Sequence, residues 1–172
     1  PAVKEEVMSL GAKFIEVEGA ADASKAGGYA VEQSEDFMKR QKAKIAESVA
    51  KADIVITTAQ IPGKKAPVLI TTEMMEAMKN GSVIIDLAAA TGGNTELTKN
   101  DETVFHNGVR IVGNSALASG MPSDASKLYG KNILNFLQLM INKEGNFNLN
   151  FEDDLVKGTC VVHGGAITSE RV

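Results

Sequence analysis

The chain lacks several features that define large classes of proteins. It has one cysteine, Cys160, so it cannot form an internal disulfide. It has no run of about 18 apolar residues, so we expect no membrane-spanning helix in it. Its formal charge of −4 at pH 7 disfavours a nucleic-acid partner, because phosphate binding needs a basic face. His106 and His163 are far apart and lack metal-ligand spacing, so no metal site is expected.

A glycine motif of the form G-x-G-x-x-G is absent as well. That motif normally opens a dinucleotide-binding fold, between its first strand and its first helix. The rest of the composition is ordinary, with 44% hydrophobic and 23% charged residues. At 172 residues, the chain has the length of one domain of ordinary size.

The most informative stretch covers residues 53–94. Ile54–Ile56 and Val83–Ile85 are uninterrupted β-branched runs, which are typical of parallel strands covered on both faces. The segment between them is long enough for one crossover helix. Ligands of such sheets bind beyond the carboxyl ends of the strands. Thr57–Gln60 and residues 86–94 lie at these ends, so we expect a binding site there.

Further elements are predicted on both sides of this stretch. They are a strand at 14–17, a loop at 18–31, a helix at 34–52 capped by Ser34, a helix after Thr71 or Thr72, a strand at 109–112, a loop at 113–122, a helix at 123–142 capped by Ser123, and two strands in the tail. The pattern predicts an α/β fold, a Rossmann-type parallel sheet with helices on both faces, and the missing G-x-G-x-x-G motif indicates that this sheet is incomplete at the N-terminus. Residues 1–122 form the partial Rossmann domain, and residues 123–172 form a long helix and β tail that dock on the rest of a longer protein.

Several stretches resemble a known family. They are TTAQIPGK at 57–64, AP.LIT..M...M from Ala66 to Met78, GSVIIDLAAATGGN at 81–94, Gly27–Ala30 and Leu128–Asn132. They are similar to the NAD(H)-binding domain I, in the alpha subunit, of proton-translocating NAD(P) transhydrogenase. Alanine dehydrogenase carries a looser version of the same run. The resemblance extends from Pro1 to about Ile167.

This resemblance implies that Pro1 lies just after the second strand of the fold. The two strands that would join residues 14–17 to residues 54–58 are then absent, and buried strand edges are left open. We therefore expect a fragment that does not stand alone. Its partner would be the missing upstream segment or a second copy, as in a homodimer. A small complete fold is the alternative.

The resemblance also implies a site for NAD(H). The residues that match the family's nucleotide-binding positions are Gly28, Tyr29, Gln41, Thr58, Ala59 and Gln60. In transhydrogenases the loop that matches Gly28 and Tyr29 closes over the nucleotide, and relatives usually carry Leu where Gln60 stands. Taken without the resemblance, Gly28 and Tyr29 suit a surface loop, and Gln41 suits a boundary position on a helix. Thr58, Ala59 and Gln60 suit a strand-end turn. Asp86 is expected to have a structural role, and no residue suits a general acid or base.

The implied function is hydride transfer between NAD(H) and NADP(H), with NADP(H) held on another domain and the reaction coupled to proton translocation. The chain would then be a peripheral part of an inner- or cytoplasmic-membrane enzyme, facing the cytoplasm or matrix, with other transhydrogenase domains or subunits as partners. Alone it is expected to be inactive. The alternatives are an alanine dehydrogenase-like soluble oxidoreductase and a structural remnant that binds nothing.

Overall fold

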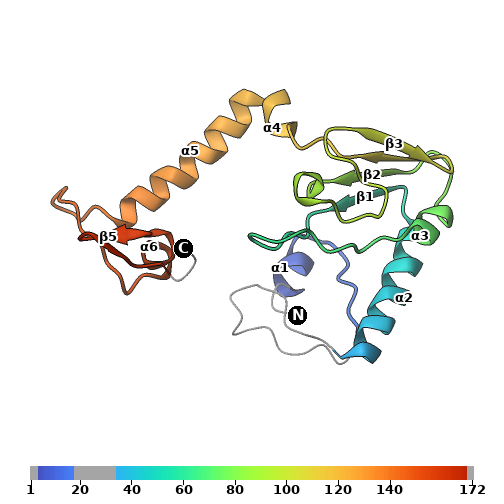
Figure 1. Ribbon diagram of the computed structural model, residues 1–172, viewed down its shortest axis with the longest axis horizontal. Coiled ribbons are helices and arrows are strands. Elements are labelled where there is room, and N and C mark those ends of the chain that lie inside the picture. Colours follow the sequence, from blue (N-terminus) through green and yellow to red (C-terminus); the bar gives the residue numbers. More distant parts are fainter. Residues whose placement is uncertain (1–3, 18–33, 170–172) are drawn as a thin grey trace. The chain divides into compact units, whose positions relative to one another are not determined.

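The computed structural model describes residues 4–17 and 34–169, which belong to two compact units (Figure 1). The first unit, Pro1–Ala116, contains α1 (Lys4–Ser9), α2 (Glu35–Lys51), β1 (Ile54–Thr57), α3 (Thr72–Glu76), β2 (Val83–Asp86), the 3-10 helix η1 (Ala89–Thr91), β3 (Thr103–His106) and β4 (Val109–Val112). The second unit, Leu117–Val172, contains α4 (Leu117–Gly120), α5 (Pro122–Leu139), α6 (Asp154–Thr159), β5 (Val162–His163) and β6 (Ala166–Ile167).

A four-stranded sheet with the order β1-β2-β4-β3 organises the first unit. β1 and β2 are parallel, as are β2 and β4, and the register aligns Ile56 with Ile85 and Val112. β3 runs antiparallel to β4 and joins it through Asn107 and Gly108, which both have positive φ. The mixed sheet with its crossover helix confirms the predicted Rossmann-type α/β class. The β3–β4 hairpin was not predicted.

The caps of α2 and α3 follow the sequence prediction. The Ser34 hydroxyl accepts a hydrogen bond from the Phe37 amide, and the Thr71 hydroxyl accepts one from the Met74 amide. The predicted cap at Ser123 is wrong, because α5 begins one residue earlier, at Pro122, with Met121 as its N-cap. Proline suits the first helical position, since its fixed φ matches a helix and the missing N–H would be unpaired there anyway.

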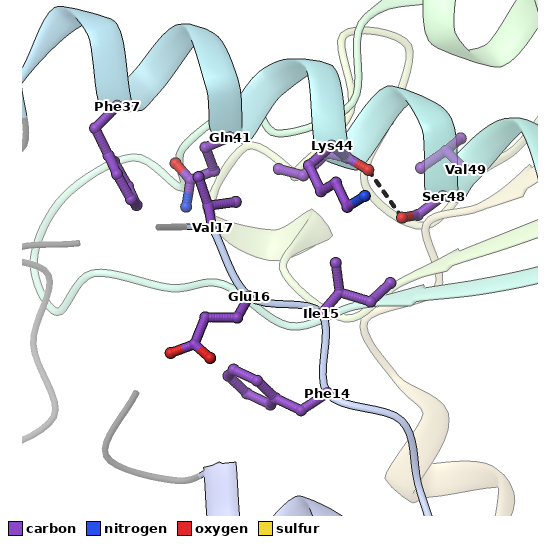
Figure 2. A pocket seen from close by; sticks show the side chains of 10 residues that line it. Phe14, Ile15, Glu16, Val17, Phe37, Gln41, Lys44, Ser48 and Val49 are labelled. Atoms are coloured by element: carbon purple, nitrogen blue, oxygen red, sulfur yellow. Dashed lines mark hydrogen bonds between the residues drawn. The ribbon is translucent and has the colours of Figure 1, made fainter. Parts of the chain in front are cut away.

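Two segments differ from the prediction. Residues 113–122 were expected to be a loop, but they include the short helix α4 and the start of α5. Residues 14–17 were expected to be a strand. They lie alongside α2 (Figure 2) but belong to no strand in the part of the chain that the structure describes. A strand exists only through hydrogen bonds to a neighbour, so its apolar pattern alone does not create one.

The core of the first unit lies on one face of the sheet. Buried side chains of α2 and of the segment around α3 pack there against Ile84, Val109 and Ile111. On the other face, Ile54 is 65% exposed, Ile56 60% and Phe105 68%. The described helices of this unit therefore cover one face, and the opposite face presents large apolar side chains to solvent.

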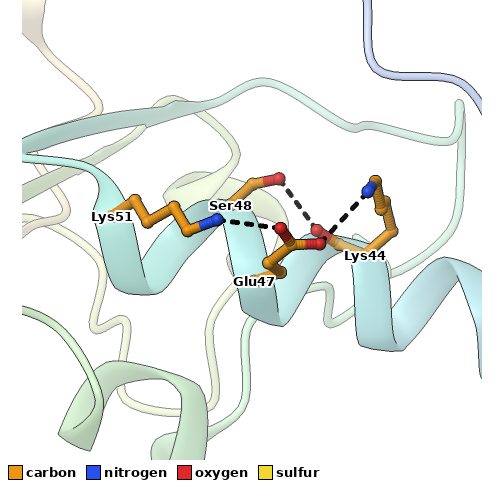
Figure 3. A network of polar contacts seen from close by, with 4 residues as sticks. All are labelled: Lys44, Glu47, Ser48 and Lys51. Atoms are coloured by element: carbon orange, nitrogen blue, oxygen red, sulfur yellow. Dashed lines mark hydrogen bonds and ion pairs between the residues drawn. The ribbon is translucent and has the colours of Figure 1, made fainter.

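The solvent side of α2 carries a small charged network (Figure 3). Lys51 and Lys44 both contact the Glu47 carboxylate, at 2.8 Å and 3.1 Å. Hydrogen bonds from Lys51 first, and from Lys44 next, lower the pKa of Glu47 to about 2. The favourable contribution of this exposed network is complete above the ordinary carboxyl pKa and is lost as the pH falls through about 2.

The second unit combines α5 with a small tail. β5 and β6 pair antiparallel across Gly164 and Gly165, which both have positive φ. This confirms the prediction of two tail strands, while α6 before them was not predicted. None of the described helices is long and apolar enough to cross a membrane.

Candidate functional site

The candidate site lies where β1 and β2 end. Thr57 and Asp86, the last residues of these parallel strands, are paired in register. Just beyond them, the Leu87 amide donates to the Thr57 carbonyl at 2.9 Å. The segments that follow both strands therefore leave the sheet at the same edge, where ligands of Rossmann-type sheets bind. Thr58, Ala59 and Gln60 form the strand-end loop.

The strand-end loop is held by one buried side chain. The Ala59 amide donates to Oδ1 of Asn94 at 2.9 Å. In return, Nδ2 of Asn94 donates to the Ala59 carbonyl and to the Pro67 carbonyl, both at 2.8 Å. Gln60 adds a bond from its Nε2 to the Leu87 carbonyl at 3.0 Å. Ala59 is half-buried, whereas Thr58 and Gln60 are exposed. The loop is therefore held through the Ala59 backbone, while its other two residues are accessible to solvent.

Asp86 supports this arrangement from the end of β2. Its side chain is fully buried and accepts three hydrogen bonds, from the Ala88 amide at 3.0 Å, the Asn94 amide at 2.6 Å and the Thr98 hydroxyl at 2.6 Å. Its carboxylate is therefore committed to the fold. This confirms the structural role predicted for Asp86.

Gln41 lies elsewhere in the first unit. It projects from α2 into a mostly apolar cavity of about 330 Å³, which Phe14, Val17 and Phe37 also line (Figure 2). The described lining of this cavity comes from α2 and from residues 14–17, and it does not include the strand-end loop. Among the predicted site residues, the structure brings Thr58, Ala59 and Gln60 together. Gly28 and Tyr29 lie outside the described residues.

The sequence placed Asn94 at this edge only as the last residue of the 86–94 segment, without a role of its own, and it did not identify Thr98. A signal for them exists in the two glycines before Asn94. Both glycines have positive φ, and a Cβ on Gly93 would lie 2.5 Å from Thr98 Cβ and 2.8 Å from the Asp86 carboxylate. Only glycine permits so close an approach, so Gly-Gly-Asn after a buried strand indicates a packed polar cluster.

The fold and the strand-end loop define the chain as a Rossmann-type α/β protein. Within that class it belongs to the family described as alanine dehydrogenase/PNT, C-terminal domain, whose model matches residues 1–170. This confirms the family resemblance found in the sequence.

Relatives of known name are similar over nearly the whole chain. NAD(P) transhydrogenase subunit alpha of Haemophilus influenzae is 47% identical over 167 residues, which are 96% of this chain and 33% of the relative. In Rhodospirillum rubrum, a relative named as the first part of NAD(P) transhydrogenase subunit alpha is 50% identical over 169 residues, which are 96% of this chain and 44% of the relative. The chain thus spans less than half the length of these relatives.

Solved structures give the same grouping. The crystal structure of transhydrogenase from Sinorhizobium meliloti is 46% identical and matches with a TM-score of 0.70, over 97% of this chain and 43% of that one. A structure of L-alanine dehydrogenase is 27% identical and matches with a TM-score of 0.52, over 77% of this chain and 38% of that one.

Proposed function

We propose that the chain is the NAD(H)-binding part of a transhydrogenase, which transfers hydride between NAD(H) and NADP(H) and couples this transfer to proton translocation. The observation that carries the proposal is the strand-end loop, fixed at the ligand-binding edge of the sheet in a chain 50% identical to a transhydrogenase alpha subunit. The neighbouring carboxylate of Asp86 is fully buried and accepts three hydrogen bonds from the protein itself, so it is not proposed to contact the ligand.

The residues proposed to contact NAD(H) are Gly28, Tyr29, Gln41, Thr58, Ala59 and Gln60. Small side chains at the strand end allow the backbone to approach a ribose or a nicotinamide. The nicotinamide supplies the hydride chemistry when it is bound, and the chain's own residues bind and orient it. No residue is proposed as a general acid or base.

The whole enzyme would need partners. NADP(H) would be held on another domain, and the proton pathway would belong to a membrane part outside this chain. The chain would lie at the periphery of that membrane, facing the cytoplasm or matrix. We further propose that β1, an edge strand of the sheet in the described residues, pairs with an upstream segment or with a second copy, as in a homodimer, and that the chain is inactive alone.

We expect the natural full-length protein to bind NADH at least about tenfold more tightly than NADPH, or about 1.4 kcal/mol in binding free energy. The net charge of −4 disfavours the additional phosphate of NADPH, in line with the resemblance to the NAD(H) side of the family. Isothermal titration calorimetry with both nucleotides at fixed ionic strength provides the measurement. Equal or reversed affinities would contradict the proposal.

Tyr29→Ala is expected to weaken NADH binding by about 1 kcal/mol, or roughly fivefold, which is the scale of one aromatic stacking contact. The chain's other tyrosine, Tyr129 on α5, is 68% exposed and offers a matched control. Tyr129→Ala should leave the NADH dissociation constant unchanged in the same titration. If Tyr29→Ala binds NADH as tightly as the parent protein, Tyr29 does not cover the nucleotide.

An alanine dehydrogenase-like oxidoreductase is the second candidate, favoured by the match to L-alanine dehydrogenase. The two activities are separable in one experiment. A transhydrogenase reduces an NAD analogue with NADPH, whereas the alternative enzyme reduces NAD with L-alanine. Activity with L-alanine alone would replace the proposed function by the alternative.

A further inference from the structure

The Asn94 side chain performs a task that a neighbouring strand performs inside a sheet. It accepts from the Ala59 N–H at 2.9 Å and donates to the Ala59 carbonyl at 2.8 Å. Paired residues of adjacent antiparallel strands exchange both backbone groups in this way. Here a side-chain amide, 35 positions further along the chain, replaces the strand.

Ala59 needs such a partner because it lies past the end of the sheet. The β1–β2 register ends with the pair Thr57 and Asp86, and the bond from the Leu87 amide to the Thr57 carbonyl follows it. Ala59 is half-buried beyond that point, where its backbone groups require hydrogen bonds from another source. The remaining N–H of the Asn94 amide reaches the Pro67 carbonyl at 2.8 Å, so one side chain ties Ala59 to Pro67.

Asn94 is itself fixed in place. Its side chain is fully buried, and its backbone N–H donates to the Asp86 carboxylate at 2.6 Å. Its backbone carbonyl accepts from the backbone amides of Leu69 at 2.8 Å and Ile70 at 3.0 Å. The Thr98 hydroxyl holds the same Asp86 oxygen at 2.6 Å. A continuous series of hydrogen bonds therefore links the strand-end loop to the end of β2.

We infer that Asn94 is a positioning residue for the dinucleotide, because it holds the strand-end loop in the conformation that receives the ligand. This inference rests on the proposed function. Asn94 hydrogen-bonds only to the Ala59 backbone of the loop, while Thr58 and Gln60 remain exposed and able to contact the ligand. Without Asn94, the loop must be ordered at the moment of binding, and binding then includes the loss of one residue's backbone entropy. We expect this loss to raise the NADH dissociation constant roughly tenfold.

The test uses Asn94→Ala in the natural full-length protein. Amide hydrogen exchange followed by NMR is expected to show at least about tenfold faster exchange at Ala59, and calorimetry a dissociation constant for NADH raised roughly tenfold. Asn142→Ala is the matched control, because the Asn142 side chain accepts from the amides of Glu144 and Asn146 in the second unit. This control should change neither quantity.

A stability control separates positioning from general damage. Val109 is fully buried in the core and lies on β4, which is separated by β2 from the strand that leads into the strand-end loop. Val109→Ala should lower the unfolding midpoint yet leave both the NADH dissociation constant and the exchange rate at Ala59 as in the parent. Thr98→Val removes one hydrogen bond to Asp86 and should raise the NADH dissociation constant by a smaller factor. If Asn94→Ala does not fold, Thr98→Val replaces it in the test, and an unchanged dissociation constant in Thr98→Val then overturns the positioning role.

The outcomes are distinguishable. If the parent binds NADH and Asn94→Ala binds it equally tightly while Ala59 exchanges faster, the positioning role is overturned and the proposed function stands. An equal loss of affinity in Val109→Ala would also overturn the role, since the loss would then follow stability alone. If the parent itself does not bind NADH, the proposed function fails and the positioning role fails with it.

Discussion

Gly113→Ala is expected to destabilise the first unit by about 3 kcal/mol or more, because the change places an atom where backbone already lies. A Cβ on Gly113 would lie 2.1 Å from the Lys99 carbonyl oxygen and 3.3 Å from that of Glu102. Gly113 also donates to the Glu102 carbonyl at 2.9 Å and accepts from the Asp101 amide at 2.8 Å. The strand end cannot move away without breaking these bonds.

Denaturant unfolding followed by circular dichroism gives the free energy for this comparison. Gly158→Ala is the matched control, because Gly158 is exposed within α6 and a Cβ there meets nothing within 4 Å. Alanine in a helix interior is better than glycine by roughly 0.5–1 kcal/mol, so the control should be slightly stabilised. If Gly113→Ala lowers the free energy of unfolding by less than about 1 kcal/mol, residues 99–102 can shift to accommodate the Cβ, contrary to the packing described.

The 172-residue chain is expected to behave in solution as an assembly rather than as a monomer of 18.2 kDa. β1 is an edge strand of the described sheet, and it carries Ile54 at 65% and Ile56 at 60% exposure. An exposed apolar edge strand is a template for pairing with another chain. We expect an interface above about 2,000 Å² in total, the size typical of obligate assemblies.

Light scattering combined with mass spectrometry measures the assembly directly. Ile56→Lys is expected to shift the population toward smaller species, because a charge on an edge strand opposes pairing. Leu155→Lys on α6, where the leucine is 61% exposed, provides the control and should leave the mass unchanged. A monodisperse 18.2 kDa monomer that unfolds cooperatively would refute the expectation.

The fold was predictable where the signals are local. The β-branched runs of β1 and β2, and the caps at Ser34 and Thr71, depend on neighbours in sequence and were predicted correctly. The β3–β4 hairpin was missed although Asn107-Gly108 is a strong two-residue turn signal. Residues 14–17 were misassigned for the opposite reason, since a strand requires a pairing partner that the local pattern does not reveal.

The candidate site was predictable only in outline. The rule that ligands bind at the carboxyl ends of parallel strands located the strand-end loop. It could not reveal that Asn94 holds Ala59, because this contact spans 35 positions and follows from the packing of two loops. Gln41 was assigned to the site by resemblance. In the structure it lines the cavity between α2 and residues 14–17, and the strand-end loop is not part of the described lining of that cavity.

The tie from Asn94 to both Ala59 and Pro67 closes the base of a seven-residue excursion, residues 60–66. Its tip turns at Gly63, where φ is +71°, and the Lys64 amide bonds locally to the Ile61 carbonyl at 3.1 Å. Since the base is fixed independently of the tip, insertions or deletions around Gly63 can vary between homologues without shifting Thr58. Loop closure entropy grows slowly with length, so such variation has a small energetic cost. Residues 61–66 can therefore change in length and sequence while the strand-end loop keeps its conformation.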